Sequence, residues 1–237
     1  MLIIAHRGAS AHAPENTMAA FRLALKMNAV AMELDVHQTR DGKLAVIHDW
    51  DFRRVGGKRT KIGAVSMAQA RAIDVGSWFS ENFSSERAPE LGDALDLSRG
   101  RAELHIELKA GSGKYFGIEE RVARLLDKRR AWEWTMISSF DHKALFRMRE
   151  ISSRARLGYL LGISSLRKAW RQTREMRAES LNISVRQARR RVVESAHRRG
   201  LKVYVYTVDS PKEFSRLKRI GVDGVYANDP RIGDRPS

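Results

Sequence analysis

Short apolar runs alternate along this chain with segments of helical periodicity, and this alternation restricts the fold more than any other feature. Several helical segments carry end signals. Asp141 is placed as an N-cap, and the helix that begins at Pro211 is preceded by Ser210 and followed by a glycine. Repeated strand and helix units indicate a parallel sheet, either doubly wound or closed. The runs predicted as strands are residues 2–5, 31–36, 44–49, 103–109, 135–140, 156–161, 180–183, 202–208 and 224–228.

The length of 237 residues suits one domain with one substantial core. No glycine-rich phosphate loop of the Rossmann or Walker type follows a predicted strand, which weakens the doubly wound alternative. A closed barrel of eight strands needs one run fewer than the sequence offers, so one is misassigned or lies outside the barrel. The weakest candidates are the last run and the connection 37–43, where Asp41-Gly42 predicts a tight turn. Residues 51–101 are expected to form loops and short helices over one barrel end.

The formal charge of +16 is concentrated in the second half of the chain. Residues 1–118 hold 16 Lys and Arg against 14 Asp and Glu, whereas residues 119–237 hold 28 against 14. Basic clusters such as 128–130 and 186–200 lie in segments of helical period, so they are expected on solvated helix faces. Attraction to a polyanion or to an acidic membrane surface is the alternative. No nucleic-acid partner is expected, because the clusters lack interleaved aromatic residues and any recognisable binding motif.

No stretch of the sequence approaches the roughly 20 apolar residues of a membrane span, and no signal peptide pattern is present. The first residues read as a strand of the fold, so a cytoplasmic protein is the simplest interpretation. The absence of cysteine excludes disulfides, thiolate metal ligands and a cysteine nucleophile. The oligomeric state cannot be inferred from the sequence.

Two carboxylates, Glu33 and Asp35, stand one residue apart in an otherwise apolar strand, and alternation places both on one face. The same alternation in 103–109 places Glu107 and Lys109 together on the polar face. Helices cover the outside of a barrel, so these polar side chains should face the barrel axis near its mouth. Three carboxylates would repel one another there unless a divalent cation with oxygen ligands, Mg²⁺ or Ca²⁺, lies between them.

Two histidines stand at the ends of predicted strands, His6 after the first and His48 after the third. Active-site residues of barrels come from such strand ends. Imidazole has a pKa of about 6.5, so one ring can act as base and the other as acid near neutral pH. The fixed positive charges of Arg7 and Lys109 suit an anionic substrate such as a phosphate ester.

The chain resembles the glycerophosphodiester phosphodiesterase family over almost its full length. The segments that carry the resemblance are HRGASAHAPENTMAAF, ELDVHQTRDGKLAVIHD, IDVGSWF, ELHIELK, SSFD, VYVYTVD and GVDGVYAND. The resemblance implies a (β/α)8 TIM barrel formed by residues 1–237 as a single domain. It also implies roles for individual residues: His6 and His48 as acid and base, Glu33, Asp35 and Glu107 as metal ligands, and Arg7 and Lys109 as phosphate contacts.

The implied reaction is metal-dependent hydrolysis of glycerophosphodiesters, such as glycerophosphocholine or glycerophosphoethanolamine, to glycerol 3-phosphate and an alcohol. The nucleophile is either a hydroxide on the cation or the 2-hydroxyl of the substrate. Two alternatives are a lysophospholipase D acting on lipid substrates and a non-catalytic barrel that binds an anionic partner through its basic half.

The chain also departs from the family pattern near the expected site. The segment after Asp49 lacks the usual threonine-rich loop, and Tyr206 stands where a tryptophan commonly lines the pocket. Tyr206 is therefore expected either to contact substrate or to pack at the barrel mouth. Because loop residues shape the pocket, the alcohol group is not determined by the sequence.

Overall fold

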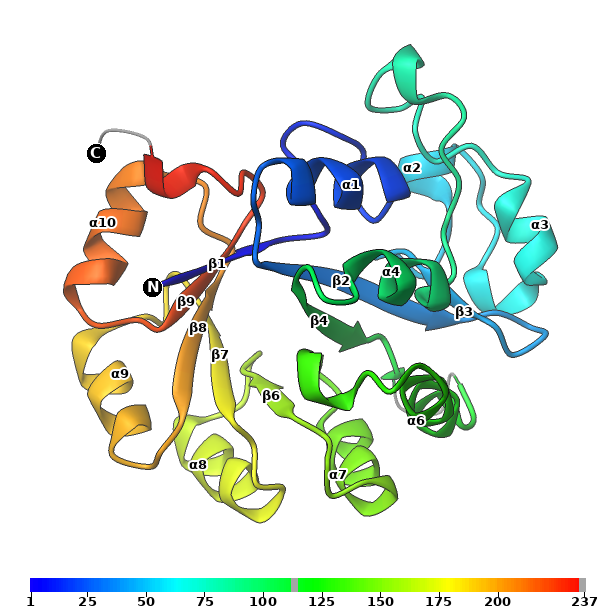
Figure 1. Ribbon diagram of the computed structural model, residues 1–237. Coiled ribbons are helices and arrows are strands. Elements are labelled where there is room, and N and C mark those ends of the chain that lie inside the picture. The colour runs from blue at the N-terminus through cyan, green and yellow to red at the C-terminus, as the bar shows by residue number, and fades with distance from the viewer. Residues whose placement is uncertain (112–114, 235–237) are drawn as a thin grey trace.

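Eight parallel strands close into a barrel in the computed structural model, which describes residues 1–111 and 115–234 (Figure 1). The barrel closes because β1 pairs with β9 on one side and with β2 on the other. The (β/α)8 fold expected from the resemblance is therefore confirmed. Its strands are β1 (Leu2–Ala5), β2 (Ala31–Gln38), β4 (Glu103–Leu108), β5 (Thr135–Ser139), β6 (Leu157–Leu160), β7 (Ser180–Ser184), β8 (Lys202–Tyr206) and β9 (Gly224–Ala227).

The remaining strand, β3 (Leu44–Val46), pairs antiparallel with the end of β2 and lies outside the parallel barrel. The turn between them contains Gly42 at φ +75°, as expected for the tight turn predicted at Asp41-Gly42. One predicted run does lie outside the barrel, but it is the third run and not the last, which forms β9. β3 also ends at Val46 rather than at Asp49. His48 therefore follows a hairpin strand and not, as expected, a strand of the barrel.

Helices surround the barrel on its outer side (Figure 1). Each buries an apolar stripe against the strands, as α1 does with Phe21 and Leu25. The small barrel interior holds a separate cluster that includes Ile4, Met136 and Tyr204. The helices of this outer layer are α1 (Met18–Lys26), α4 (Leu91–Ser98), α6 (Ile118–Arg129), α7 (His142–Ile151), α8 (Leu166–Glu175), α9 (Arg190–His197) and α10 (Pro211–Arg219).

The segment between β3 and α4 forms its own small apolar cluster beside the hairpin, centred on Phe52, Ile62 and Met67. Its end is joined to β3 by the amide of Val46, which donates to the carbonyl of Pro89. Its short elements are α2 (Arg53–Gly56), η1 (Ile62–Ala64), α3 (Met67–Arg71) and η2 (Glu81–Phe83). Two further 3-10 turns, η3 (Trp132–Trp134) and η4 (Ile232–Asp234), lie later in the chain.

None of the helices in the described part of the chain has the length and apolar character needed to cross a membrane. The basic clusters lie largely on exposed positions of the later helices and their connections, including Arg186, Arg190 and Arg198.

Asp141 is the N-cap of α7, because its side chain accepts a hydrogen bond from the Lys143 amide at 3.1 Å. Ser210 occupies the same position before α10 but makes no capping hydrogen bond with its side chain. We expect Asp141→Ala to lower the free energy of unfolding by about 1 kcal/mol. Ser210→Ala is the matched control and should change it less. Urea denaturation of both variants measures the difference, and equal effects would contradict the capping role.

Candidate active site

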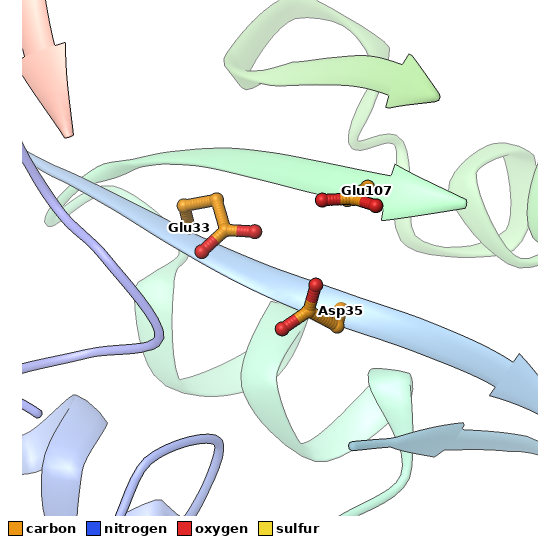
Figure 2. Close-up of side chains that lie close together, drawn as sticks. All are labelled: Glu33, Asp35 and Glu107. Atoms are coloured by element: carbon orange, nitrogen blue, oxygen red, sulfur yellow. The ribbon is translucent and has the colours of Figure 1, made fainter. Parts of the chain in front are cut away.

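Three carboxylates from two adjacent strands converge inside the barrel mouth. Glu33 and Asp35 lie on β2 and Glu107 on β4, and Asp35 is in register with Glu107 (Figure 2). One oxygen from each group can be chosen so that all three lie within 4.8 Å of one another. Glu33 and Asp35 are buried, and Glu107 is partly buried. The alternation of side chains along each strand therefore brings the three predicted ligands together.

Two cations partly compensate this negative charge. Lys109 Nζ lies 2.9 Å from Asp35 Oδ1 and 2.6 Å from Glu107 Oε1. Arg7 Nε lies 3.2 Å from Asp35 Oδ2, and the Arg7 amide donates to Glu33 Oε2 at 3.0 Å. Among the described residues, Asp35 thus receives both cationic side chains, whereas Glu33 receives a backbone amide and lies 4.0 Å from His6 Nε2. Three buried acids against two cations leave the cluster short of positive charge.

The acid–base properties of the cluster follow from this pairing. Burial, and then the charges of Asp35 and Glu107, raises the pKa of Glu33 well above its ordinary range. Burial likewise raises the pKa of Glu107 to about 7, although Lys109 opposes the shift. Burial would raise the pKa of Asp35 too, but the nearby Lys109 and Arg7 hold it well below its ordinary range.

The cluster fits a divalent cation. Its donors are all carboxylate oxygens, the ligands preferred by hard cations. Asp35 Oδ1 accepts no hydrogen bond of normal geometry from the described residues, although Lys109 lies beside it. A cation placed among the three groups would also relieve the repulsion that raises the pKa of Glu33 and Glu107.

Cation binding should depend on pH, because the ligands must be deprotonated. The pKa of Glu107 lies near 7 without a cation, so below pH 7 a proton occupies the site that the cation needs. We therefore expect the affinity for Mg²⁺ or Ca²⁺ to rise as the pH rises through 7, with proton release on binding.

Isothermal titration calorimetry in buffers of different ionisation enthalpy measures both the affinity for the cation and the number of protons released on binding. Glu33→Gln removes one ligand and serves as the comparison variant, in which affinity should fall. An affinity that does not change between pH 6 and pH 8, which bracket the raised pKa of Glu107, would contradict the expected competition.

His6 and His48 both line one cavity of about 220 Å³, together with Glu33 and Glu107. His6 Nδ1 lies 2.8 Å from Asn228 Oδ1. The amide nitrogen of Asn228 donates to Asp209 at 2.7 Å, which fixes the orientation of the amide. His6 Nδ1 therefore carries the proton and donates, which leaves Nε2 as a proton acceptor.

His48 is oriented by a carboxylate. Its Nδ1 lies 2.7 Å from Asp49 Oδ1, and hydrogen bonds from Arg54 and His48 help to hold the pKa of Asp49 below its ordinary range. His48 Nδ1 therefore donates to an ionised group, and Nε2 is left for proton transfer. Burial, followed by the charge of Arg7, lowers the pKa of His6 to about 4, and burial also lowers the pKa of His48.

Tyr206 lines the cavity at the end of β8. Its ring packs edge-on against the ring of Phe140, with the two ring centroids 5.9 Å apart. Its hydroxyl donates to the carbonyl of Leu161 at 2.9 Å, so this group is already held by the protein. The cavity thus has a charged side and an aromatic side. The residues that line it are His6, Arg7, Glu33, His48, Glu107, Lys109, Ser138, Phe140, Leu160, Tyr206, Thr207 and Tyr226.

A larger cavity of about 600 Å³ lies at the other barrel end, between the end of α8 and the start of β8. Its lining includes Arg171, Arg174, Arg177 and Arg199 but no carboxylate and no histidine. It therefore offers no group for acid–base chemistry near neutral pH.

The chain is similar to known proteins over almost its full length. Residues 6–232 match the sequence model of the Glycerophosphoryl diester phosphodiesterase family. The chain belongs to this family. A glycerophosphodiester phosphodiesterase of Caldanaerobacter subterraneus subsp. tengcongensis is 34% identical over 230 residues, which cover 97% of this chain and 94% of the relative. The recognised family and the activity class, phosphoric diester hydrolase, are thus confirmed.

Solved structures show the same relationship. The crystal structure of a glycerophosphodiester phosphodiesterase from Agrobacterium tumefaciens matches with a TM-score of 0.85 at 30% identity, covering 98% of both chains. An Oleispira antarctica phosphodiesterase, solved in complex with the product sn-glycerol-3-phosphate, matches with a TM-score of 0.90 at 25% identity. That match covers 98% of this chain and 94% of the other.

Several residues that hold the candidate site in place were not predicted from the sequence. Asn16 donates to Asp35 Oδ2 at 2.7 Å and accepts from the Asp35 amide, and it adopts a left-handed backbone with φ +57°. Glu15 lies 2.8 Å from Arg7 and receives two hydrogen bonds from Arg54, which also binds Asp49. A continuous chain of ion pairs therefore joins Arg7 to the partner of His48.

His37 is a further missed residue, and the sequence did contain a signal for it. It continues the alternating face of Glu33 and Asp35, it is fully buried, and its Nε2 lies 2.9 Å from the carbonyl oxygen of His48. Its Nδ1 is bonded to Tyr115 at 2.8 Å. His37 therefore helps to position the segment that carries His48.

Proposed function

We propose that this phosphodiesterase hydrolyses glycerophosphodiesters, such as glycerophosphocholine or glycerophosphoethanolamine, to glycerol 3-phosphate and an alcohol. The observation that carries the proposal is one cavity lined by two histidines, two cations and two of three clustered carboxylates, with Asp35 directly behind. The names of the relatives support the substrate class. The sn-glycerol-3-phosphate bound to the Oleispira antarctica phosphodiesterase supports the product.

Arg7 and Lys109 bind the phosphoryl group in this proposal. Both side chains line the cavity, and each already contacts a carboxylate, so both are oriented before substrate arrives. A guanidinium and an ammonium group stabilise the extra negative charge that develops on the phosphoryl oxygens in the transition state. Glu33, Asp35 and Glu107 would hold one Mg²⁺ or Ca²⁺, which polarises the phosphoryl group when bound.

The two histidines transfer the protons. One Nε2 accepts the proton of the attacking group, which is either water or the 2-hydroxyl of the substrate. Attack by water gives glycerol 3-phosphate directly, whereas attack by the 2-hydroxyl gives a cyclic 1,2-phosphate that water then opens. The other imidazole, in its protonated form, donates a proton to the leaving alkoxide as the bond from phosphorus to that oxygen breaks. Burial lowers the pKa of His48, and the negative charge of Asp35 and the hydrogen bond to Asp49 oppose that shift.

The direct test is hydrolysis of purified glycerophosphodiesters, with glycerol 3-phosphate measured by a coupled assay. We expect release of glycerol 3-phosphate from glycerophosphocholine or glycerophosphoethanolamine, loss of the activity in excess chelator, and recovery with added Mg²⁺ or Ca²⁺. Full activity after extended dialysis against chelator would remove the cation from the proposal. No release of glycerol 3-phosphate from either diester would contradict the proposed substrate class.

His6→Ala and His48→Ala should each lower kcat by about 10² or more, because each removes a proton-transfer group. His197 is the matched control: its Nε2 also lies 2.8 Å from a carboxylate, Asp223, but at the other barrel end. His197→Ala should leave kcat unchanged. Steady-state kinetics on a soluble diester measures kcat for all three variants. A histidine whose removal leaves kcat unchanged has no part in the reaction.

A further inference from the structure

Exposed apolar side chains gather around the mouth of the active site. Among the residues described, eight large apolar side chains are exposed, and five of these lie at the catalytic end of the barrel. The other three, Met1, Val30 and Ile151, are dispersed over the opposite end and include no aromatic residue. We call the five the mouth rim: Trp50, Trp78, Phe116, Phe140 and Ile163.

Three members of the mouth rim lie on successive loops between a barrel strand and the next helix. Phe116 lies between β4 and α6, Phe140 between β5 and α7, and Ile163 between β6 and α8. Such loops all emerge at the catalytic end of a barrel. Phe116 is 87% exposed and Ile163 is fully exposed. Neither lines the catalytic cavity, so substrate positioning does not account for their exposure.

The two tryptophans continue the mouth rim on the hairpin side. Trp50 stacks on Tyr115, next to Phe116, with ring centroids 5.5 Å apart. Trp78 lies 5.9 Å from the guanidinium carbon of Arg54, whose side chain binds Asp49 beside His48. The exposed apolar groups therefore border the cavity from the hairpin round to the loop after β6.

Exposed cations stand between these apolar groups. Arg53, Lys58 and Lys61 follow Trp50, Lys143 follows Phe140, and two more cations follow Ile163. The nearby Asp49 and Asp51 already pair with Arg54 and Arg53. Exposed acids at this end, such as Glu81 and Asp209, are fewer. Aromatic and aliphatic tips beside lysine and arginine match the boundary of an anionic bilayer, where apolar groups enter the lipid and cations meet phosphate.

We propose that the mouth rim docks on an anionic lipid bilayer and turns the catalytic cavity toward it. A second copy of the chain fits this surface less well, because a symmetric contact would bring the cations of the two copies together. Docking by itself does not depend on the proposed function. The consequence of docking does rest on the proposed function. A phosphodiester in the membrane whose glycerol still carries one acyl chain becomes a substrate, and its acyl chain stays in the bilayer.

Sedimentation with vesicles of phosphatidylcholine, alone or mixed with phosphatidylserine, tests the docking. We expect the protein to bind the mixed vesicles and to bind pure phosphatidylcholine more weakly. The double variant Phe116→Ser/Ile163→Ser should bind the mixed vesicles about tenfold more weakly or worse, because it removes two groups that enter the lipid. Ile151→Ser is the matched control, an exposed isoleucine at the opposite end, and should bind as the unaltered protein does.

Three results would overturn the docking proposal. The first is no binding to mixed vesicles. The second is equal binding by the double variant and the unaltered protein. The third is binding that survives in the double variant but is lost in Arg171→Gln/Arg174→Gln/Arg177→Gln, which would place the contact at the opposite barrel end. Self-association that the double variant abolishes, seen by analytical ultracentrifugation without lipid, would assign the rim to a second copy instead.

The proposed function is tested in a separate assay, which measures the turnover of soluble glycerophosphocholine. The double variant should hydrolyse it at the rate of the unaltered protein, because neither side chain lines the cavity. Vesicle binding without turnover of any glycerophosphodiester would overturn the proposed function and leave the docking intact. Turnover of a lysophospholipid in mixed vesicles should fall with docking in the double variant, and turnover that does not fall would separate the rim from substrate access.

Discussion

The repulsion among three carboxylates buried in the barrel mouth is the constraint on which the rest of the site depends. Glu33, Asp35 and Glu107 come from adjacent strands in register, so no change of rotamer can move them far apart. Arg7 and Lys109 reduce the repulsion but leave Glu33 with no cationic side chain in contact. A site of this kind favours whatever adds positive charge, whether a proton or a cation. The carboxylate cluster therefore makes the barrel mouth a favourable place for positive charge.

Below the carboxylates, the barrel interior combines apolar side chains such as Ile4 and Met136 with a layer of hydrogen-bonded polar side chains. Tyr226 lies at the centre of that layer: its hydroxyl is 3.0 Å from both His105 Nδ1 and Asn182 Nδ2. Burial, and then the charge of Glu33, raises the pKa of the Tyr226 hydroxyl well above its ordinary range, so the group stays neutral. The next acid below the cluster, Glu103 at the start of β4, is paired with His105 and Arg156. The positive charge that the carboxylate cluster lacks is therefore a property of the barrel mouth.

Short-range periodicity explains why much of the fold and the carboxylate cluster could be predicted from the sequence. Alternation along β2 and β4 fixes which side chains face inward, and that pattern is local. The partners of the site depend on contacts between distant segments. Asn228 meets His6 across 222 positions of the chain, and Asn16 reaches Asp35 only through its left-handed backbone. The tight turn predicted at Asp41-Gly42 does form, but the apolar run 44–49 does not by itself reveal that its strand ends at Val46 and lies outside the barrel.

The hairpin explains how a residue outside the barrel joins the catalytic cavity. β2 runs to Gln38, beyond the barrel pairing with β4, and this extension carries β3 back toward the mouth. The chain therefore returns His48 to the cavity that His6 also lines without using a strand of the barrel. The segment that follows His48 departs from the family pattern and contributes Trp50 and Arg54 to the surroundings of the site. A change in this segment would alter the surroundings of His48 and the entrance to the cavity together, because Trp50 and Arg54 lie beside both. In the proposed reaction, the choice of alcohol would therefore be coupled to the position of a proton-transfer group.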